Sequence, residues 1–343
     1  MSESKPPVNP VAPSSGAAPT VSIVATGSYV PERVLTNADL EKMVDTSDEW
    51  IFTRSGIRER RIAAEGEATS DMAAAAAQRA LDSIGMRGEE VDLILVATCT
   101  PDMIFPSTAC YVQQQIGARR AACLDVSAAC SGFLYAMDIG RQYILTGSAK
   151  TVLIIGAEKM SAIVDWTDRG TCVLFGDGAG AAILQARGAT HGILPSVLGS
   201  DGELSELLTL PGGGSRNPAS QEVLDGRLCY VKMAGREVFK HAVTHMANAA
   251  TQILERYGMT IDDVACIIPH QANARIIQAI AQRIGAPMEK IYMNVDRYGN
   301  TSAASVIMAM DEASRTGRIR QGDMVLLVVF GSGFTWAASL VEW

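Results

Sequence analysis

The residue with the clearest chemical potential is Cys130, which lies in the stretch LDVSAACSGF at 124–133. A short apolar approach ends in small residues, and a long amphipathic run follows from 131 to about 146, which predicts a strand, a tight turn and a buried helix. A cysteine at a helix start lies among unpaired N–H groups and at the positive end of the helix dipole, and both favour the nucleophilic thiolate. This stretch fits a catalytic nucleophile and a small buried cysteine equally well.

Two further polar residues stand at the ends of apolar segments. His270 follows the apolar run 264–269 within the motif PHQAN, and Asn300 follows Gly299 within the motif GNTSAAS. Each has an ordinary interpretation when taken alone. A histidine after a buried strand is often a hydrogen-bonded core residue, and an asparagine after glycine is often a turn residue.

An internal repeat places these residues in relation to one another. Three segments, 84–95, 135–138 and 151–155, return in similar form 173 residues later, as the spacing of Gly85 and Gly258 shows (258 − 85). Three agreeing registers predict a duplicated α/β unit, with helices rich in Ala and Gly buried between the sheets of the two halves.

The repeat also shows which copy carries which residue. In this register the twin of Cys130 is Ala303, so the thiol is present in one half only, and the twin of Ala97 is His270. Asn300 lies in the loop that corresponds to the loop of Cys130. Two halves stacked face to face can bring these strand-end loops into one pocket.

Composition limits the class of protein. The 343 residues are 48% hydrophobic and 6% aromatic with a net charge of −8, which argues against general affinity for nucleic acid or anionic membranes. Seven scattered cysteines without a CxxC pair fit a reducing, cytoplasmic location and argue against a disulfide framework and a metal site. No apolar run is long enough to span a membrane. Residues 1–19, rich in Pro, Ser and Ala, are expected to be a disordered tail rather than a signal peptide.

Local patterns predict the elements that precede the cysteine. We expect a strand at 21–28, a helix at 35–44 capped by Thr36 or Asn37, and a buried strand at 91–97. A loop-rich segment at 45–61 holds a tryptophan and several arginines. An Ala-rich helix at 70–84 should begin with a Ser-Asp cap.

Four motifs stand in a characteristic order along the chain, namely DVSAACSG, PHQAN, GNTS and FGSGFTW. With them the chain resembles the β-ketoacyl-acyl carrier protein synthase III family, the condensing enzymes that initiate type II fatty acid synthesis. The resemblance runs from about residue 21 to 343. It implies an α/β protein with the thiolase-like fold, an α-β-α-β-α layered sandwich. Its halves would be 20–190, which carries Cys130, and 191–343, which carries His270 and Asn300.

The resemblance also implies a reaction. Cys130 would accept an acyl group, expected to be acetyl, from acyl-CoA, because a thioester carbon suits a soft nucleophile. Malonyl-acyl carrier protein would then lose CO₂, and neutral His270 and the NH₂ group of Asn300 would donate hydrogen bonds to the enolate oxygen. Backbone N–H groups of Cys130 and Ser332 would hold the tetrahedral oxyanion, although the family usually has glycine at the position of Ser332. The products are β-ketoacyl-acyl carrier protein, CoA and CO₂, and no cofactor or metal is expected beyond the CoA thioester.

Further residues match the substrate-binding positions of the family. Trp50, Arg54 and Arg169 correspond to residues at the adenine end of CoA, where arginine can stack on a purine and pair with phosphate. Asn273 corresponds to a residue near the pantetheine arm, and Phe105 to one that reaches the acyl pocket of the partner in a homodimer. Ordinary surface charge is the other interpretation of the arginines.

A basic patch is expected to receive the acidic carrier protein. Lys240, Arg275 and Arg283 match or adjoin docking positions of the family. Lys232, Arg236 and Lys240 recur every four residues and would form one stripe if the segment were helical. A merely solvated helix face is the alternative interpretation.

Related activities are separated by residue counts. Elongating condensing enzymes use two histidines and thiolases a second cysteine near the C-terminus, whereas this chain has no histidine after His270 and no cysteine after Cys266. Plant-type polyketide synthases share the Cys-His-Asn set, but the motifs PHQAN and GNTSAAS favour the fatty-acid branch. A specialised secondary-metabolite condensing enzyme and a Cys-His acyl-thioester hydrolase stay open. A catalytically inactive scaffold would be expected to have lost one of the three residues, and none is lost.

Overall fold

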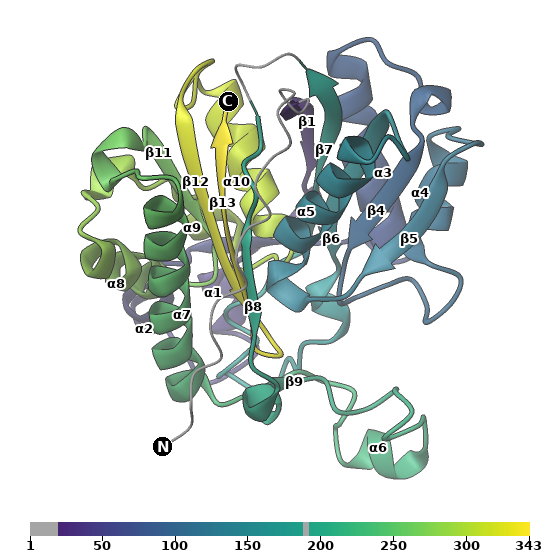
Figure 1. The fold of residues 1–343 in the computed structure, drawn as a ribbon. Helices are drawn as coiled ribbons and strands as arrows, with labels where there is room; N and C mark the ends of the chain where they lie inside the picture. The colour runs from purple at the N-terminus through teal and green to yellow at the C-terminus, as the bar shows by residue number, and fades with distance from the viewer. Residues whose placement is uncertain (1–19, 188–191) are drawn as a thin grey trace.

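The computed structural model describes residues 20–187 and 192–343 (Figure 1). The predicted tail at 1–19 and the predicted boundary between the halves at 190/191 lie outside these residues. In the part of the chain that the model describes, no helix is both long enough and apolar enough to cross a membrane.

Two sheets carry the two halves. The first has the strand order β1-β7-β6-β4-β5, in which β5, β4 and β6 are parallel and β7 and β1 antiparallel. Its strands are β1 Thr20–Tyr29, β4 Leu93–Ala97, β5 Ala122–Val126, β6 Thr151–Glu158 and β7 Gly178–Arg187. The second has the order β11-β12-β13-β8. Its strands are β8 Val197–Ser200, β11 Cys266–Pro269, β12 Met324–Gly331 and β13 Thr335–Glu342.

Helices complete five layers. One hydrophobic cluster joins both sheets to the two central helices, α5 Gly132–Leu145 and α10 Ala304–Arg315. The outer face of the first sheet packs on α3 Thr69–Ser83 and α4 Thr108–Gln115. The outer face of the second packs on α7 Gly235–Arg256 and α8 Ala274–Ile284. Figure 1 shows α7 and α8 on one side, α3 and α4 on the other, and α5 and α10 between. The predicted α-β-α-β-α sandwich is confirmed.

The predicted duplication is visible strand by strand. β12 begins and ends 173 residues after β6 (324 − 151 and 331 − 158). The turns before the two central helices match as well, because Ala129 (φ 45°) and its twin Ser302 (φ 48°) both adopt the left-handed conformation. The copies differ at the sheet edge, where the region that corresponds to β5 forms the short helix α9 Val295–Tyr298.

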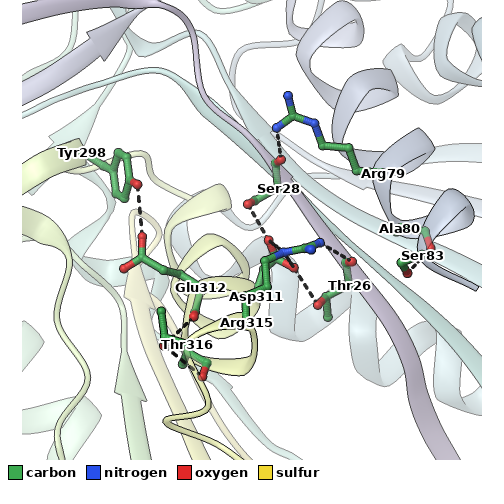
Figure 2. A network of polar contacts seen from close by, with 11 residues as sticks. Thr26, Ser28, Arg79, Ala80, Ser83, Tyr298, Asp311, Glu312, Arg315 and Thr316 are labelled. Carbon is green, nitrogen blue, oxygen red and sulfur yellow. Dashed lines mark hydrogen bonds and ion pairs between the residues drawn. The ribbon is translucent and has the colours of Figure 1, made fainter.

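A buried carboxylate joins the halves on the side of α10 that faces β1. Asp311 accepts hydrogen bonds from Thr26 Oγ1 (2.8 Å) and Ser28 Oγ (2.6 Å), both in β1. Arg315 pairs with the same carboxylate at 3.0 Å and also donates to the carbonyl of Thr26 (Figure 2). Because all of its donors are supplied by the protein, this charge can be buried between the halves.

The expected helix at 35–44 is wrong. Residues Arg33–Thr36 form strand β2, and only Asn37–Leu40 form a helix, α1, whose N-terminus Thr36 caps as predicted. The expected loop-rich segment is largely ordered. It forms helix α2, Asp48–Ser55, and strand β3, Glu59–Ile62, which pairs with β2.

The start of α3 also differs from the prediction. Ala68 is the N-cap residue, and its own N–H donates to the carboxylate of Asp71, so the expected Ser-Asp cap is absent. The remaining short elements connect the halves near the site. They are β9 Leu208–Thr209, β10 Lys232–Met233 and α6 Gln221–Asp225.

Candidate active site

A cavity of about 490 Å³ is lined by residues of both halves. Cys130 comes from the first half, and His270, Asn300 and Ser332 from the second, together with Asn273. The rest of the lining is mainly apolar and includes Met160, Ile163, Phe175, Leu208, Val231 and Phe239. The fold therefore brings together the three residues that the motifs singled out and places them beside an apolar space.

Cys130 lies in a single 3₁₀ turn, Ala129–Ser131, that leads into α5. The predicted helix start is confirmed, but the prediction that the resting residue is a thiolate is wrong. Burial raises the pKa of the Cys130 thiol to about 12, although a hydrogen bond from the Ser302 hydroxyl acts in the opposite direction. The cost of placing a charge in a buried site outweighs the helix-start effect, so the resting enzyme holds a thiol at neutral pH.

The end of β12 approaches the backbone of this turn closely. A Cβ atom added to Gly331 would lie 2.7 Å from the backbone nitrogen of Cys130, so glycine is required there. The next residue, Ser332, does not need the left-handed conformation, which is why a serine fits this turn. The hydroxyl of Thr335 donates to the carbonyl of Ala128 at 3.0 Å and holds the two loops together.

His270 follows β11 and is buried. Its Nδ1 lies 2.6 Å from the hydroxyl of Ser305 in α10, and the backbone N–H of Gln271 donates to the same hydroxyl at 3.3 Å. Burial lowers the pKa of His270 to about 3. The imidazole is therefore neutral at physiological pH, as the sequence predicts, and one ring nitrogen is fixed by α10.

Asn300 is oriented by its own loop. Its Oδ1 accepts a hydrogen bond from the backbone N–H of Ser302 at 2.8 Å, and its backbone N–H donates to the carbonyl of Leu174 at 2.8 Å. Gly299, with φ 64°, makes the close approach to Leu174 possible, because an added Cβ would lie 2.8 Å from that carbonyl oxygen. With its oxygen engaged, the NH₂ group of Asn300 is the part that can donate into the cavity.

The predicted CoA-binding residues also lie together. The guanidinium groups of Arg54 and Arg169 stand over the ring of Trp50, 4.5 and 4.9 Å from its centroid. Asn273 begins α8, and its Nδ2 donates to the backbone carbonyl of Arg54 at 2.9 Å. Since Asn273 also lines the cavity, it connects the Trp50 cluster to the site of Cys130.

Phe105 does not line the cavity of its own chain. Its side chain is 82% exposed, and that of Ile104 is 80% exposed. The nearby strand β5 pairs only with β4, so among the described strands it forms the free edge of the first sheet.

The predicted basic patch is confirmed only in part as a continuous feature. Lys240 is exposed on α7, and Arg275 and Arg283 are exposed on α8, which packs beside α7. Arg283 donates to the hydroxyl of Thr244 on α7 at 3.2 Å. Lys232 lies in β10, before α7 begins, so the predicted stripe of three cations at helical spacing is wrong.

Four polar residues near Cys130 were not singled out by sequence. They are Cys99, Glu158, Ser302 and Ser305. Ser302 and Ser305 were inside a recognised motif but had no visible reason to differ from other small residues. Glu158 had a usable signal, because it is a charged residue at the end of an unbroken apolar strand.

Comparison with known proteins gives a consistent result. Residues 124–202 match the model for 3-oxoacyl-[acyl-carrier-protein] synthase III, and residues 254–343 match the model for its C-terminal part. The chain is 54% identical to the β-ketoacyl-[acyl-carrier-protein] synthase III of Caldanaerobacter subterraneus subsp. tengcongensis, over 94% of this chain and 97% of that protein.

Solved structures agree with the sequence comparison. The 3-oxoacyl-[acyl-carrier-protein] synthase III of Aquifex aeolicus is 48% identical, with a TM-score of 0.87 over 94% of this chain and 100% of that one. A priming β-ketosynthase from a polyketide biosynthetic pathway is 35% identical, with a TM-score of 0.87 over 94% and 96% of the two chains. These structural neighbours have the thiolase fold, which confirms the predicted fold class.

Proposed function

The chain belongs to the 3-oxoacyl-[acyl-carrier-protein] synthase III family, and from this premise we propose that it condenses an acyl-CoA primer, with acetyl-CoA as the expected one, with malonyl-acyl carrier protein. The observation that carries the proposal is the convergence of Cys130, His270 and Asn300 in one cavity with an apolar lining. The products are β-ketoacyl-acyl carrier protein, CoA and CO₂. This reaction starts fatty acid synthesis.

In the first half-reaction the sulfur of Cys130 attacks the thioester carbon and CoA departs. The backbone N–H groups of Cys130 and Ser332 are the proposed donors to the tetrahedral oxyanion. Support comes from the tight fit of Gly331 against the nitrogen of Cys130, which places the loop of Ser332 beside the nucleophile. Rigid backbone donors of this kind stabilise the charge that develops in the transition state.

In the second half-reaction malonyl-acyl carrier protein loses CO₂, and the resulting enolate attacks the acyl-Cys130 carbonyl. His270 and Asn300 are the proposed donors to the enolate oxygen. The neutral state of His270 and the engagement of the Asn300 oxygen both support a donor role. Neutral donors stabilise the enolate without holding a permanent positive charge in the buried site.

The substrates enter at the cluster around Trp50. We expect the adenine ring to stack on Trp50 beside Arg169, with Arg54 pairing a phosphate and Asn273 contacting the pantetheine arm. The two guanidinium groups that already stand over Trp50 support a planar ligand at this place. The carrier protein would then dock on the exposed cations Lys240, Arg275 and Arg283. No cofactor beyond the thioester substrate is part of the proposal.

The chain is proposed to act as a homodimer in which Phe105 reaches the acyl cavity of the partner. The free edge of β5 and the exposed apolar residues Ile104, Phe105 and Leu124 support this assembly, because an open edge strand is a template for pairing with another chain. Leu124→Lys should yield a monomer by light scattering. Phe105→Ala should change the range of acyl lengths used, and an unchanged range would contradict its role.

A cytoplasmic location is proposed as well. All seven cysteines are free thiols, as is usual in a reducing compartment.

Mass spectrometry of Cys130 tests the function directly. Incubation with a panel of acyl-CoAs should give an adduct on Cys130, and malonyl-acyl carrier protein should then remove it and release β-ketoacyl-carrier protein and CO₂. Free acid in place of β-ketoacyl product would indicate the thioester hydrolase. The solved priming β-ketosynthase keeps a second candidate in view, a specialised secondary-metabolite condensing enzyme. Preference for a long or unusual primer over acetyl-CoA would favour it.

A further inference from the structure

The duplicated fold places different residues at the ends of two equivalent strands. Glu158 ends β6, and its twin Gly331 ends β12 (331 − 158 = 173). Gly331 leaves the backbone nitrogen of Cys130 open at the start of the first central helix. At the start of the second, the carboxylate of Glu158 lies 3.4 Å from the backbone nitrogen of Ala303. A carboxylate thus fills, in one half, the position that corresponds to the oxyanion site of the other.

This carboxylate is fully buried and lies close to the nucleophile. It accepts hydrogen bonds from the hydroxyl groups of Thr100 at 2.7 Å and Ser302 at 2.9 Å, and from the thiol of Cys99 at 3.3 Å. The hydroxyl of Ser302 is also hydrogen-bonded to the sulfur of Cys130. A continuous path therefore runs from Cys130 Sγ through Ser302 Oγ to Glu158 Oε1.

The first half-reaction needs a group that accepts the thiol proton. Cys130 is protonated at neutral pH, so the attack on a thioester must be accompanied by loss of that proton. His270 is a weak base, because burial lowers its pKa to about 3. Burial raises the pKa of Glu158 above the ordinary value for a carboxyl group, which makes it a better proton acceptor than a surface carboxylate.

We propose that Ser302 and Glu158 form a proton relay that activates Cys130 in the acylation half-reaction. The thiol proton passes to Ser302 Oγ while the hydroxyl proton passes to Glu158 Oε1, and the C–S bond to the acyl group forms. When the tetrahedral intermediate collapses, the bond to the CoA sulfur breaks. The proton returns along the same path, so that CoA leaves as a thiol. Glu158 acts only through Ser302 and does not touch the substrate.

The backbone allows a clean test at Ser302. Its φ of 48° is strained for most residues, but its twin Ala129 adopts φ 45° in the other half. Ser302→Ala therefore removes the hydroxyl without asking the backbone for a conformation that alanine does not already adopt in this fold. Ser339→Ala is the matched control, because the Ser339 hydroxyl is also buried but has no hydrogen-bond partner.

The inference rests on the proposed function, and the two are tested in one experiment. Rapid mixing with labelled acetyl-CoA gives the acylation rate, and CO₂ release from the acetylated enzyme gives the second half-reaction. In Ser302→Ala acylation should slow by about 100-fold, the lower end of what general acid–base catalysis contributes, and its solvent deuterium isotope effect should fall. The second half-reaction and the Ser339→Ala control should keep the wild-type rates.

Acylation of Ser302→Ala at the wild-type rate, or an equal loss in both half-reactions, would overturn the relay while leaving the proposed function intact. A wild-type chain that acetyl-CoA does not label at Cys130 would overturn both.

Glu158→Gln separates a relay from a fixed charge. A nearby carboxylate raises the pKa of the Cys130 thiol, so a role as a fixed charge alone would make acylation faster in Glu158→Gln. The relay requires slower acylation, because the amide cannot accept the proton. Faster or unchanged acylation in a folded Glu158→Gln variant would overturn the proposal, and Ser302→Ala decides the matter if Glu158→Gln does not fold.

Discussion

The closest backbone approach in the site makes Gly331→Ala a quantitative test of the oxyanion site. The new methyl carbon would lie 2.7 Å from the nitrogen of Cys130, and ordinary contacts begin at 3.4 Å. One of the two loops must therefore move by about 0.7 Å (3.4 − 2.7). Hydrogen bonds from N–H to oxygen span only about 2.7 to 3.2 Å, so a shift of this size breaks a well-formed oxyanion contact.

The expected loss follows from the number of donors. Loss of one oxyanion donor costs about 2.7–4 kcal/mol in the transition state, which is about 10² to 10³ in rate. Overpacking should also lower the free energy of unfolding by about 1–3 kcal/mol. The affinity for acyl-CoA should change little, because the Trp50 cluster is untouched.

The assay is the rate of Cys130 acylation by acetyl-CoA, with urea unfolding to show that the variant is folded. Gly202→Ala is the matched control, since a Cβ there meets no atom within 4 Å, and it should acylate at the wild-type rate. A folded Gly331→Ala variant that acylates as fast as the wild-type chain would refute the placement of the oxyanion site.

Three further predictions address the substrates and the acid range. Arg169→Ala should raise the KM for acyl-CoA about threefold to tenfold through loss of stacking, whereas Arg58→Ala, which removes a guanidinium from the ring of Phe52 instead, should not. Lys240→Glu combined with Arg275→Glu should raise the KM for the carrier protein far more than that for acyl-CoA, and added salt should reduce the difference. An equal rise in both would exclude docking there. His270 stays neutral when folded down to a pKa of about 3 but protonates near 6.5 when unfolded, so unfolding takes up a proton between these values. The free energy of unfolding should therefore fall as pH falls from about 6.5, and urea titrations should show a shallower fall for His270→Gln.

Much of this molecule is determined by its sequence alone. The 173-residue repeat predicts two stacked halves, and the strands β6 and β12 keep that spacing at both ends. The motifs predict Cys130, His270 and Asn300 as one set, because each ends or follows an apolar segment and equivalent segments end at equivalent places. Local physics suffices here, since apolar runs form buried strands and their ends lie where the sheets end.

Local patterns were less reliable where partners distant in sequence decide the structure. Residues 35–44 look helical, but Arg33–Thr36 pair with β3, and the buried guanidinium of Arg60 binds the carbonyl of Leu35 at 3.1 Å. Residues 45–61 look irregular, yet Ser47 caps a helix and Gly56 ends it. The cap and the acidic residues at 48 and 49 were available signals.

Only the tertiary structure decided the state of the nucleophile. A helix start favours thiolate, but the same fold buries Cys130 and raises the pKa of its thiol to about 12, because desolvation depends on every layer packed around it. The position of Glu158 was likewise unreadable in the sequence. It lies 28 residues after Cys130 (158 − 130) and reaches it through Ser302, a residue of the other half. The sequence determined which residues could do the chemistry, and the packing of the two halves determined their charges and partners.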